Sequence, residues 1–209
     1  MDVIAQGQRR GSIIAPPPPG FGEGPDGSSA AFPISKALLA TWILLTAVTM
    51  LFAGLSSAYI VLRGTPEWQN ITMPRLIWAN TVVLLATSVA IEFARAAVRR
   101  NRTDGVKQWL GISGILGVAF LVGQLAVWRQ LVHAGVYLQT TLHSSFFYVL
   151  TGAHALHLAG GIGGLVVVLR KAFTHQLTAG SHEPLRVWGV YWHFMDFVWI
   201  YCLLLLLLA

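Results

Sequence analysis

Charged side chains are scarce in this chain of 209 residues, of which only 11% are Asp, Glu, Lys or Arg. Soluble globular domains usually contain about 25% charged residues, so the shortage argues against a water-soluble domain. Hydrophobic residues make up 55% of the chain, and the mean hydropathy is +0.64. The composition therefore predicts a membrane protein.

Cysteine is also nearly absent, because the chain contains a single one, Cys202. One cysteine excludes an intrachain disulfide and a cluster of thiolate metal ligands. The sequence further lacks a P-loop, a nucleophile elbow, a pair of catalytic carboxylates and a Cys-x-x-Cys motif. We therefore assign this chain no catalytic residue and no metal ligand.

Large apolar residues are rare in residues 1–35, where Pro, Gly and Ser dominate. Arg9 and Arg10 have no apolar core behind them, so the segment does not resemble a cleavable signal peptide. So little apolar surface cannot offset the entropy that is lost on ordering. We expect a disordered cytoplasmic tail over 1–35 and a membrane domain over 36–209.

Long apolar runs fill the rest of the chain. A bilayer core of about 30 Å requires roughly 20 residues of helix. The runs do not alternate as barrel strands do, so they must be helical to satisfy their backbone groups in lipid. The sequence predicts an all-α, polytopic bundle of five transmembrane helices, with spans near 36–62, 75–98, 107–132, 140–169 and 186–208.

The formal net charge of +6 has its cause in membrane topology. The basic residues flank the apolar runs and form no patch interleaved with aromatics, which argues against nucleic acid as a partner. Of the 14 lysines and arginines, only Arg63, Arg75 and Arg129 lie in the first and third loops. Because Lys and Arg are retained on the cytoplasmic side, we expect a cytoplasmic N-terminus and a periplasmic C-terminus.

Imidazole and carboxylate groups lie deep within the last two predicted spans. His193 and Asp196 are three residues apart, and Asp196 lies about 15 Å along its helix from Arg186, near the midplane. His154 and His157 share this spacing in the fourth span, which runs the opposite way, so all four residues can lie at comparable depth. We predict an intramembrane polar network of these four side chains.

Three interpretations of this network stay open from the residues alone. The side chains can satisfy one another and fix the packing of the last two helices. Alternatively, a stand-alone membrane protein can hold a b-type haem through His154 or His157 with His193. A proton-coupled carrier can instead use the buried Asp and its neighbouring His as a relay. We favour the first, since nothing else in the chain resembles a metal-binding motif.

Glu92 lies toward the cytoplasmic end of the second span, three residues before Arg95. This spacing places the two side chains on one helix face, so we expect an ion pair that reaches toward the headgroups. A role of Glu92 in proton uptake is the alternative.

Small residues recur in the third and fourth spans. In the fourth, Gly160 and Gly164 have the Gly-x-x-x-Gly spacing, which lets the backbones of neighbouring helices approach closely. We expect these two glycines to serve packing within the bundle.

Two stretches of the chain resemble the signature segments of subunit III of the haem-copper cytochrome oxidases, "TGAHALHLAGG" at 151–161 and "YWHFMDFVWIY" at 191–201. Their ordered His, Trp and Asp residues make these two stretches specific. The resemblance covers residues 40–208, with weaker similarity in "SSAYIVLRG" at 56–64, "NTVVLLATS" at 80–88 and "GQLAVW" at 123–128.

The resemblance implies a subunit without haem or copper that packs against the catalytic subunit I, with haem and copper in the partner subunits. It implies a bacterial inner-membrane complex that oxidises cytochrome c or quinol, reduces oxygen and pumps protons. Subunit II, small subunits and phospholipid bound between the helices are further implied partners, and membership of a larger respiratory supercomplex is left open. Subunit III of this family supports proton uptake, and its internal polar network matches His154, His157, His193 and Asp196 here.

The chain departs from the larger form of the family in two ways. That form has seven helices, two of which make one arm of a lipid-filled cleft, whereas this chain is similar to the five-helix form. Many members also carry a membrane glutamate in the helix that matches the first span, but the aligned position here lies near Val48. Glu92 is on another helix, so the role of that glutamate does not transfer to it.

Overall fold

The computed structural model describes residues 35–66, 68–69, 71–174 and 182–207. The chain divides into two units, Met1–Ser35 and Lys36–Ala209, and every described helix belongs to the second. The tail expected over residues 1–35 falls almost entirely outside the described residues, so its disorder stays a prediction.

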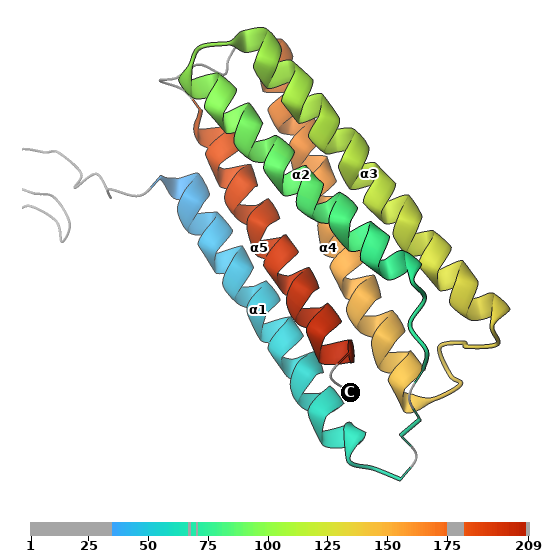
Figure 1. Cartoon of the computed structure of the whole chain (residues 1–209). Helices are drawn as coiled ribbons and strands as arrows, with labels where there is room; N and C mark the ends of the chain where they lie inside the picture. Colours follow the sequence, from blue (N-terminus) through green and yellow to red (C-terminus); the bar gives the residue numbers. More distant parts are fainter. Residues whose placement is uncertain (1–34, 67, 70, 175–181, 208–209) are drawn as a thin grey trace, which may run out of the picture. The chain divides into compact units, whose positions relative to one another are not determined.

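Five long α-helices make up the second unit (Figure 1). Each is long and apolar enough to cross a bilayer, and the described segments contain no strand. The predicted all-α fold with five membrane helices is confirmed; some helices run a few residues past the apolar windows, as helix ends commonly do. The helices are α1 (Lys36–Arg63), α2 (Leu76–Arg99), α3 (Thr103–His133), α4 (Leu142–Phe173) and α5 (Glu183–Leu207).

The last helix lies in the middle of the bundle. α5 contacts α1, α2 and α4, whereas α1 contacts only α4 and α5 among the described helices. α2 and α3 form an antiparallel pair that packs along its whole length (Figure 1). Asn101 allows the sharp reversal between them, since its φ of 52° lies in the left-handed region that Asn tolerates.

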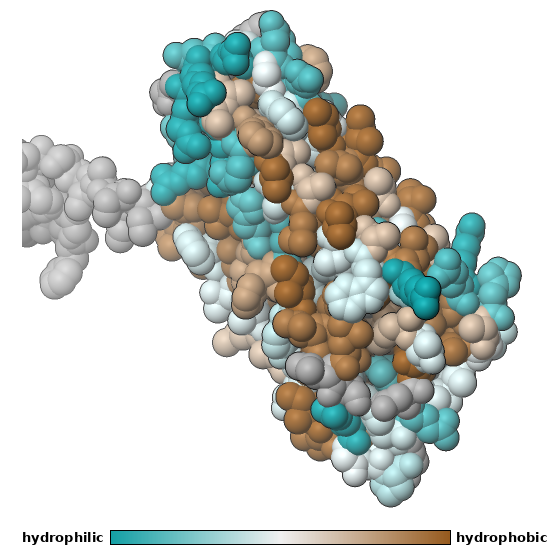
Figure 2. Space-filling model, in the orientation of Figure 1, coloured by the Kyte–Doolittle hydropathy of each residue, from teal (hydrophilic) through white to brown (hydrophobic). Residues whose placement is uncertain are grey.

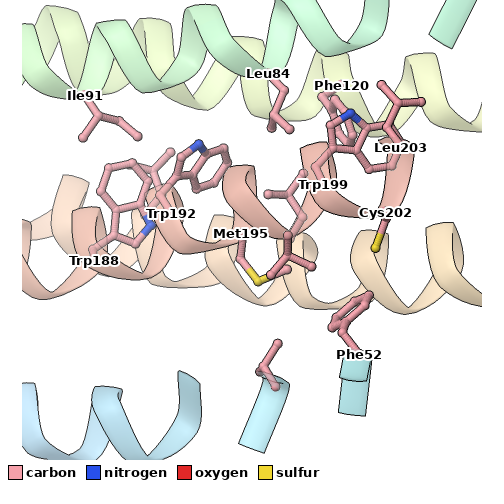
Figure 3. Packing of buried hydrophobic residues seen from close by; sticks show 14 of the residues in the cluster. Phe52, Leu84, Ile91, Phe120, Trp188, Trp192, Met195, Trp199, Cys202 and Leu203 are labelled. Atoms are coloured by element: carbon pink, nitrogen blue, oxygen red, sulfur yellow. The ribbon is translucent and has the colours of Figure 1, made fainter. Parts of the chain in front are cut away.

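Tryptophan side chains of α5 fill the centre of the bundle. Figure 3 shows Trp188, Trp192 and Trp199 along α5, and all three are buried. Glycines on the facing helices make room for the rings, because a Cβ added at Gly117 of α3 would lie 3.0 Å from the Trp192 ring. A Cβ at Gly164 of α4 would lie 3.1 Å from the Trp188 ring. Close approach at small residues is the ordinary way in which membrane helices associate.

The two glycines of the Gly-x-x-x-Gly spacing differ in what they face. Gly164 meets the Trp188 ring, whereas a Cβ at Gly160 would find only the Tyr191 hydroxyl, 4.0 Å away. The tightest glycine contact in the bundle lies elsewhere, at Gly123 of α3, where a Cβ would overlap the Asn80 side chain of α2.

The outer surface of the bundle is largely apolar. Large hydrophobic side chains are exposed on all five helices. On the face seen in Figure 2 they form a broad brown zone, with teal residues toward both ends of the bundle. An apolar belt with polar ends is the surface that a lipid bilayer requires.

Candidate functional site

A ladder of polar side chains joins α2 to α5 inside the apolar belt. Nε2 of His193 lies 2.8 Å from Oε1 of Glu92, and Nδ1 of His193 lies 3.0 Å from Oγ of Ser88. The Ser88 hydroxyl also donates to a carboxylate oxygen of Asp196. Positions i and i+4 of α2 thus face positions i and i+3 of α5, which is why four side chains meet across two helices.

This ladder, made of Ser88, Glu92, His193 and Asp196, runs from the surface into the interior. The exposed fraction of the side chain falls from 49% at Glu92 and 35% at His193 to 7% at Asp196. Oδ1 of Asp196 is buried and has no hydrogen-bond partner among the described residues. The ladder therefore opens at the bundle surface and ends at a buried carboxylate.

Arg95 extends the ladder toward the end of α2. Its Nη1 lies 2.6 Å from Oε1 of Glu92, and its Nη2 donates to the backbone carbonyl of Arg186 at 3.2 Å. Gly189 of α5 makes this possible, because a Cβ there would overlap the guanidinium of Arg95. One arginine thus pairs with the acid of its own helix and ties α2 to the backbone of α5.

The two histidines of α4 lie away from this ladder. His154 is fully buried between the rings of Phe120, at 5.9 Å, and Trp199, at 4.9 Å, and neither of its ring nitrogens has a partner among the described residues. His157 bonds through Nδ1 to the backbone carbonyl of Ala153, 2.7 Å away.

The predicted network of four residues is therefore divided in the structure. His193 and Asp196 are brought together and face α2, whereas His154 and His157 stay with the aromatic core around α4. The physical reason is the rotation of α5: the face that carries Trp188 and Trp192 packs on α4, and the polar face is turned toward α2. α4 and α5 are instead linked by Trp188, which donates to the Gly161 carbonyl at 2.8 Å, and by Tyr191, which donates to the His157 carbonyl at 2.7 Å.

Sequence reasoning missed two residues of this site, Ser88 and Gly189. Ser88 is the only group that bonds to both His193 and Asp196 in the described contacts. The sequence feature that could have identified Ser88 is its position one helical turn before Glu92. Gly189 lies four residues before His193, on the same side of α5, and its absent side chain was the signal.

Among the described residues, no group of three or more His, Cys, Asp or Glu side chains is arranged to hold a metal ion. The polar side chains of the ladder are instead bonded to one another across α2 and α5. The buried imidazole of His154 contacts aromatic rings. Such an arrangement can join helices and can accept or release a proton at Glu92 and His193.

The fold and the site define a multi-pass helical membrane protein with a polar ladder between α2 and α5. Residues 67–208 match the family described as "Cytochrome c oxidase subunit III". The chain belongs to this family. It is the subunit III of a haem-copper oxidase and a multi-pass bacterial membrane protein; subunits III of this family carry no redox centre themselves.

Three relatives show the breadth of the family. The chain is 34% identical to "Cytochrome c oxidase subunit 3" of Synechocystis over 79% of its own length and 72% of the relative's. It is 33% identical to the protein of the same name from Corynebacterium diphtheriae, over 77% and 82%. It is 28% identical to "Cytochrome bo(3) ubiquinol oxidase subunit 3" of Pseudomonas aeruginosa, over 76% and 78%. The alternatives of a stand-alone haem protein and a proton-coupled carrier find no support in these relatives.

Proposed function

We propose that this chain stabilises the catalytic subunit I of its oxidase by packing against it with the face that α2 and α5 share. Association with other oxidase subunits follows from membership of the family. The observation that carries the choice of face is the Glu92–His193 pair, which is half exposed on an otherwise apolar surface.

The depth of this pair supports the proposal. Glu92 lies seven residues before the end of α2 at Arg99, about 10 Å along the helix, so the proposal places its carboxylate within the apolar part of the span. A charged side chain at the centre of a bilayer costs about 3 kcal/mol, and part of that cost applies at this depth. A partner that offers polar atoms to Glu92 and His193 removes the exposure to lipid, so a protein neighbour is favoured over lipid on this face.

The same ladder supports a contribution to proton uptake. Acid, imidazole, hydroxyl and acid follow one another within hydrogen-bond distance, from Glu92 through His193 and Ser88 to Asp196. Within the described residues the ladder ends at Asp196, so the proposed proton exchange takes place at its surface end. We propose that it exchanges protons with the neighbouring subunit through Glu92.

We further propose an orientation of the chain in the membrane and a location for the haem and copper. The ends of α2 and α4 and the starts of α3 and α5 meet at one end of the bundle, where Arg99, Arg100, Arg102, Arg170 and Lys171 lie. Because basic residues are retained in the cytoplasm, this end faces the cytoplasm. Haem and copper belong to the partner subunits, and subunit II and small subunits complete the complex.

The test is a substitution at Glu92 in the assembled oxidase. Glu92→Gln keeps the size of the side chain and removes its charge, so we expect association with subunit I to weaken by about 2 kcal/mol. The measurement is the amount of subunit I that stays with this chain as the detergent concentration is raised. Glu183→Gln is the matched control, because Glu183 lies exposed at the first turn of α5.

Equal retention of subunit I by Glu92→Gln and Glu183→Gln would contradict the choice of face. The proton role is measured separately, as the rate of proton uptake from a pH-indicating dye by the intact complex. We expect slower uptake in Glu92→Gln, and an unchanged rate in complexes that keep subunit I would leave the ladder with a packing role alone.

A further inference from the structure

The polar ladder between α2 and α5 makes three short contacts, and each contact needs one hydrogen between its two atoms. Glu92 contacts His193 at 2.8 Å, and His193 contacts Ser88 at 3.0 Å. Ser88 in turn contacts Asp196. A neutral imidazole supplies one hydrogen and a serine hydroxyl supplies one, whereas ionised carboxylates supply none. The ladder therefore holds one proton more than two carboxylates, a hydroxyl and a neutral imidazole carry.

Arg95 restricts where this extra proton can lie. Its Nη1 lies 2.6 Å from Oε1 of Glu92, the same oxygen that faces Nε2 of His193. A guanidinium only donates, and an ionised carboxylate oxygen can accept two hydrogen bonds. Oε1 therefore accepts from both Arg95 and Nε2, so Nε2 carries a hydrogen. The extra proton lies further into the bundle, on His193 or Asp196.

Two arrangements of hydrogens satisfy the two remaining contacts. In the first, a protonated Asp196 donates to Ser88, and the Ser88 hydroxyl donates to Nδ1 of a neutral His193. In the second, Nδ1 of a charged imidazolium donates to Ser88, and the hydroxyl donates to the Asp196 carboxylate. Passing from the first to the second breaks the carboxyl O–H bond and forms a new O–H bond at Ser88, while the former hydroxyl hydrogen moves to Nδ1. One proton thus moves from the acid to the imidazole, and the hydroxyl is restored.

The surroundings stabilise each arrangement at one end of the ladder. Oδ1 of Asp196 is buried and has no hydrogen-bond partner among the described residues, which favours a neutral carboxyl because burying an unpaired charge is costly. The Glu92 carboxylate, 2.8 Å from Nε2, favours an imidazolium at His193. In both arrangements the charges of Arg95 and of the three ionisable ladder residues sum to zero, which suits a site between membrane-spanning helices.

The other ionisable groups on the surrounding helices lie away from the ladder. On α4, His157 bonds to the Ala153 carbonyl, and His154 lies between aromatic rings. Tyr191 of α5 donates to the His157 carbonyl of α4. The sequences of α1 and α3 carry Asp, Glu, Lys, Arg or His only near the helix ends. The extra proton is therefore assigned to the ladder itself.

We propose that the ladder holds one exchangeable proton, which His193 and Asp196 share through the hydroxyl of Ser88. Ser88 is the positioning residue, because its hydroxyl bonds to both, whereas Nδ1 of His193 and Oδ2 of Asp196 are 4.0 Å apart, too far for a direct hydrogen bond. Asp196 is buried and His193 is partly exposed, so the transfer carries the proton between the interior and the surface end of the ladder. Its use in proton uptake rests on the proposed function.

The first test follows the ring nitrogens of His193 by nitrogen NMR, in the full chain in mild detergent at neutral pH. The His193 signals are those that are missing in His193→Gln. We expect a protonated Nε2, and an Nδ1 signal at least about a tenth of the way from both the bare and the protonated positions. Asp196→Asn should return Nδ1 to the bare position, because the amide donates to Ser88 and has no proton to share. The control Glu183→Gln, in the first turn of α5, should leave both signals unchanged.

The second test measures whether the proton leaves Asp196 through the hydroxyl. The infrared band of the protonated carboxyl, identified by its absence in Asp196→Asn, is followed after transfer of the chain to heavy water. We expect Ser88→Ala to slow the exchange of this proton at least about tenfold, because the relay to His193 is lost. A merely structural role of Ser88 predicts the opposite, since a destabilised chain opens more often and exchanges faster. Ser88→Thr keeps the hydroxyl and should stay within about twofold of the unaltered rate.

Three results would overturn the proposal. A bare Nε2 would place the extra proton on Glu92. A fully bare or fully protonated Nδ1 in the unaltered chain would mean that the proton stays on one residue. An exchange rate in Ser88→Ala equal to or above that of the unaltered chain would mean that the proton leaves Asp196 without the hydroxyl.

Ser88→Cys covers a failure of the alanine variant to fold. A thiol fills the space of the hydroxyl but is a weak donor, so we expect exchange at least about threefold slower than in the unaltered chain, and an unchanged rate would count against the relay. Both tests use this chain without partner subunits. They can therefore fail while Glu92→Gln still weakens association with subunit I and slows proton uptake by the intact complex, and the reverse.

Discussion

Ser88→Ala probes the ladder at its centre. The substitution removes the one hydroxyl that bonds to both His193 and Asp196. Hydrogen bonds between membrane helices average about 0.6 kcal/mol, so the two bonds together contribute about 1 kcal/mol. The loss also leaves the buried Asp196 carboxylate without a hydrogen-bond partner among the described residues, with only Nδ1 of His193 4.0 Å from its Oδ2, which costs about 1–3 kcal/mol more.

We therefore expect Ser88→Ala to lower the free energy of unfolding by about 2–4 kcal/mol. The assay is equilibrium unfolding of the full chain in mixed micelles, followed by tryptophan fluorescence. Ser56→Ala is the matched control, because Ser56 is buried and its hydroxyl bonds only to the Phe52 carbonyl of its own helix, at 2.7 Å. The control should cost less than about 0.5 kcal/mol.

A double-mutant cycle separates the ladder from other effects of the substitution. If the hydroxyl stabilises the carboxylate, Ser88→Ala and Asp196→Ala should be coupled by about 1 kcal/mol, because each removes the same contact. Strict additivity, or a cost of Ser88→Ala no larger than that of Ser56→Ala, would refute the reasoning.

Three further predictions follow from other contacts. Gly123→Ala should destabilise the chain by about 1–3 kcal/mol, because the new Cβ overlaps Asn80. Gly163→Ala is the control, because a Cβ there meets nothing within 4 Å, and it should leave the midpoint of detergent unfolding unchanged. Similar midpoints for the two variants would contradict the packing argument. Trp199→Phe removes the donor that bonds to Thr81 at 3.0 Å and should cost about 1 kcal/mol in the same assay, with an unchanged midpoint as the contrary result. The purified chain alone should show no Soret absorption band; a strong band that disappears in His193→Ala would reopen the assignment of haem to the partner subunits.

The membrane spans could be predicted from the sequence because hydropathy is a local property. A run of about 20 apolar residues has one stable structure in lipid, so helix number and approximate bounds follow without knowledge of neighbours. The motif around His193 and Asp196 pointed to the family for a similar reason, since residue type and spacing are visible in the chain itself.

The contacts of the site could not be predicted in this way. Spacing places His193 and Asp196 on one side of α5, but it does not say whether that side faces α4 or α2. Their depth agreed with that of His154 and His157, and depth alone suggested one cluster. In the structure the packed Trp192 and Trp199 rings turn the polar side of α5 toward Ser88 and Glu92 of α2.

The sequence by itself determined the membrane location, the five helices and the family, because apolar length and ordered motifs act within single segments. Only the tertiary structure decided that Arg95 lies across Gly189 and that the buried acid bonds to α2. The physical reason is that the rotation of each helix about its axis is set by how side chains from several helices fit together, and that fit is a property of the bundle and of no single segment.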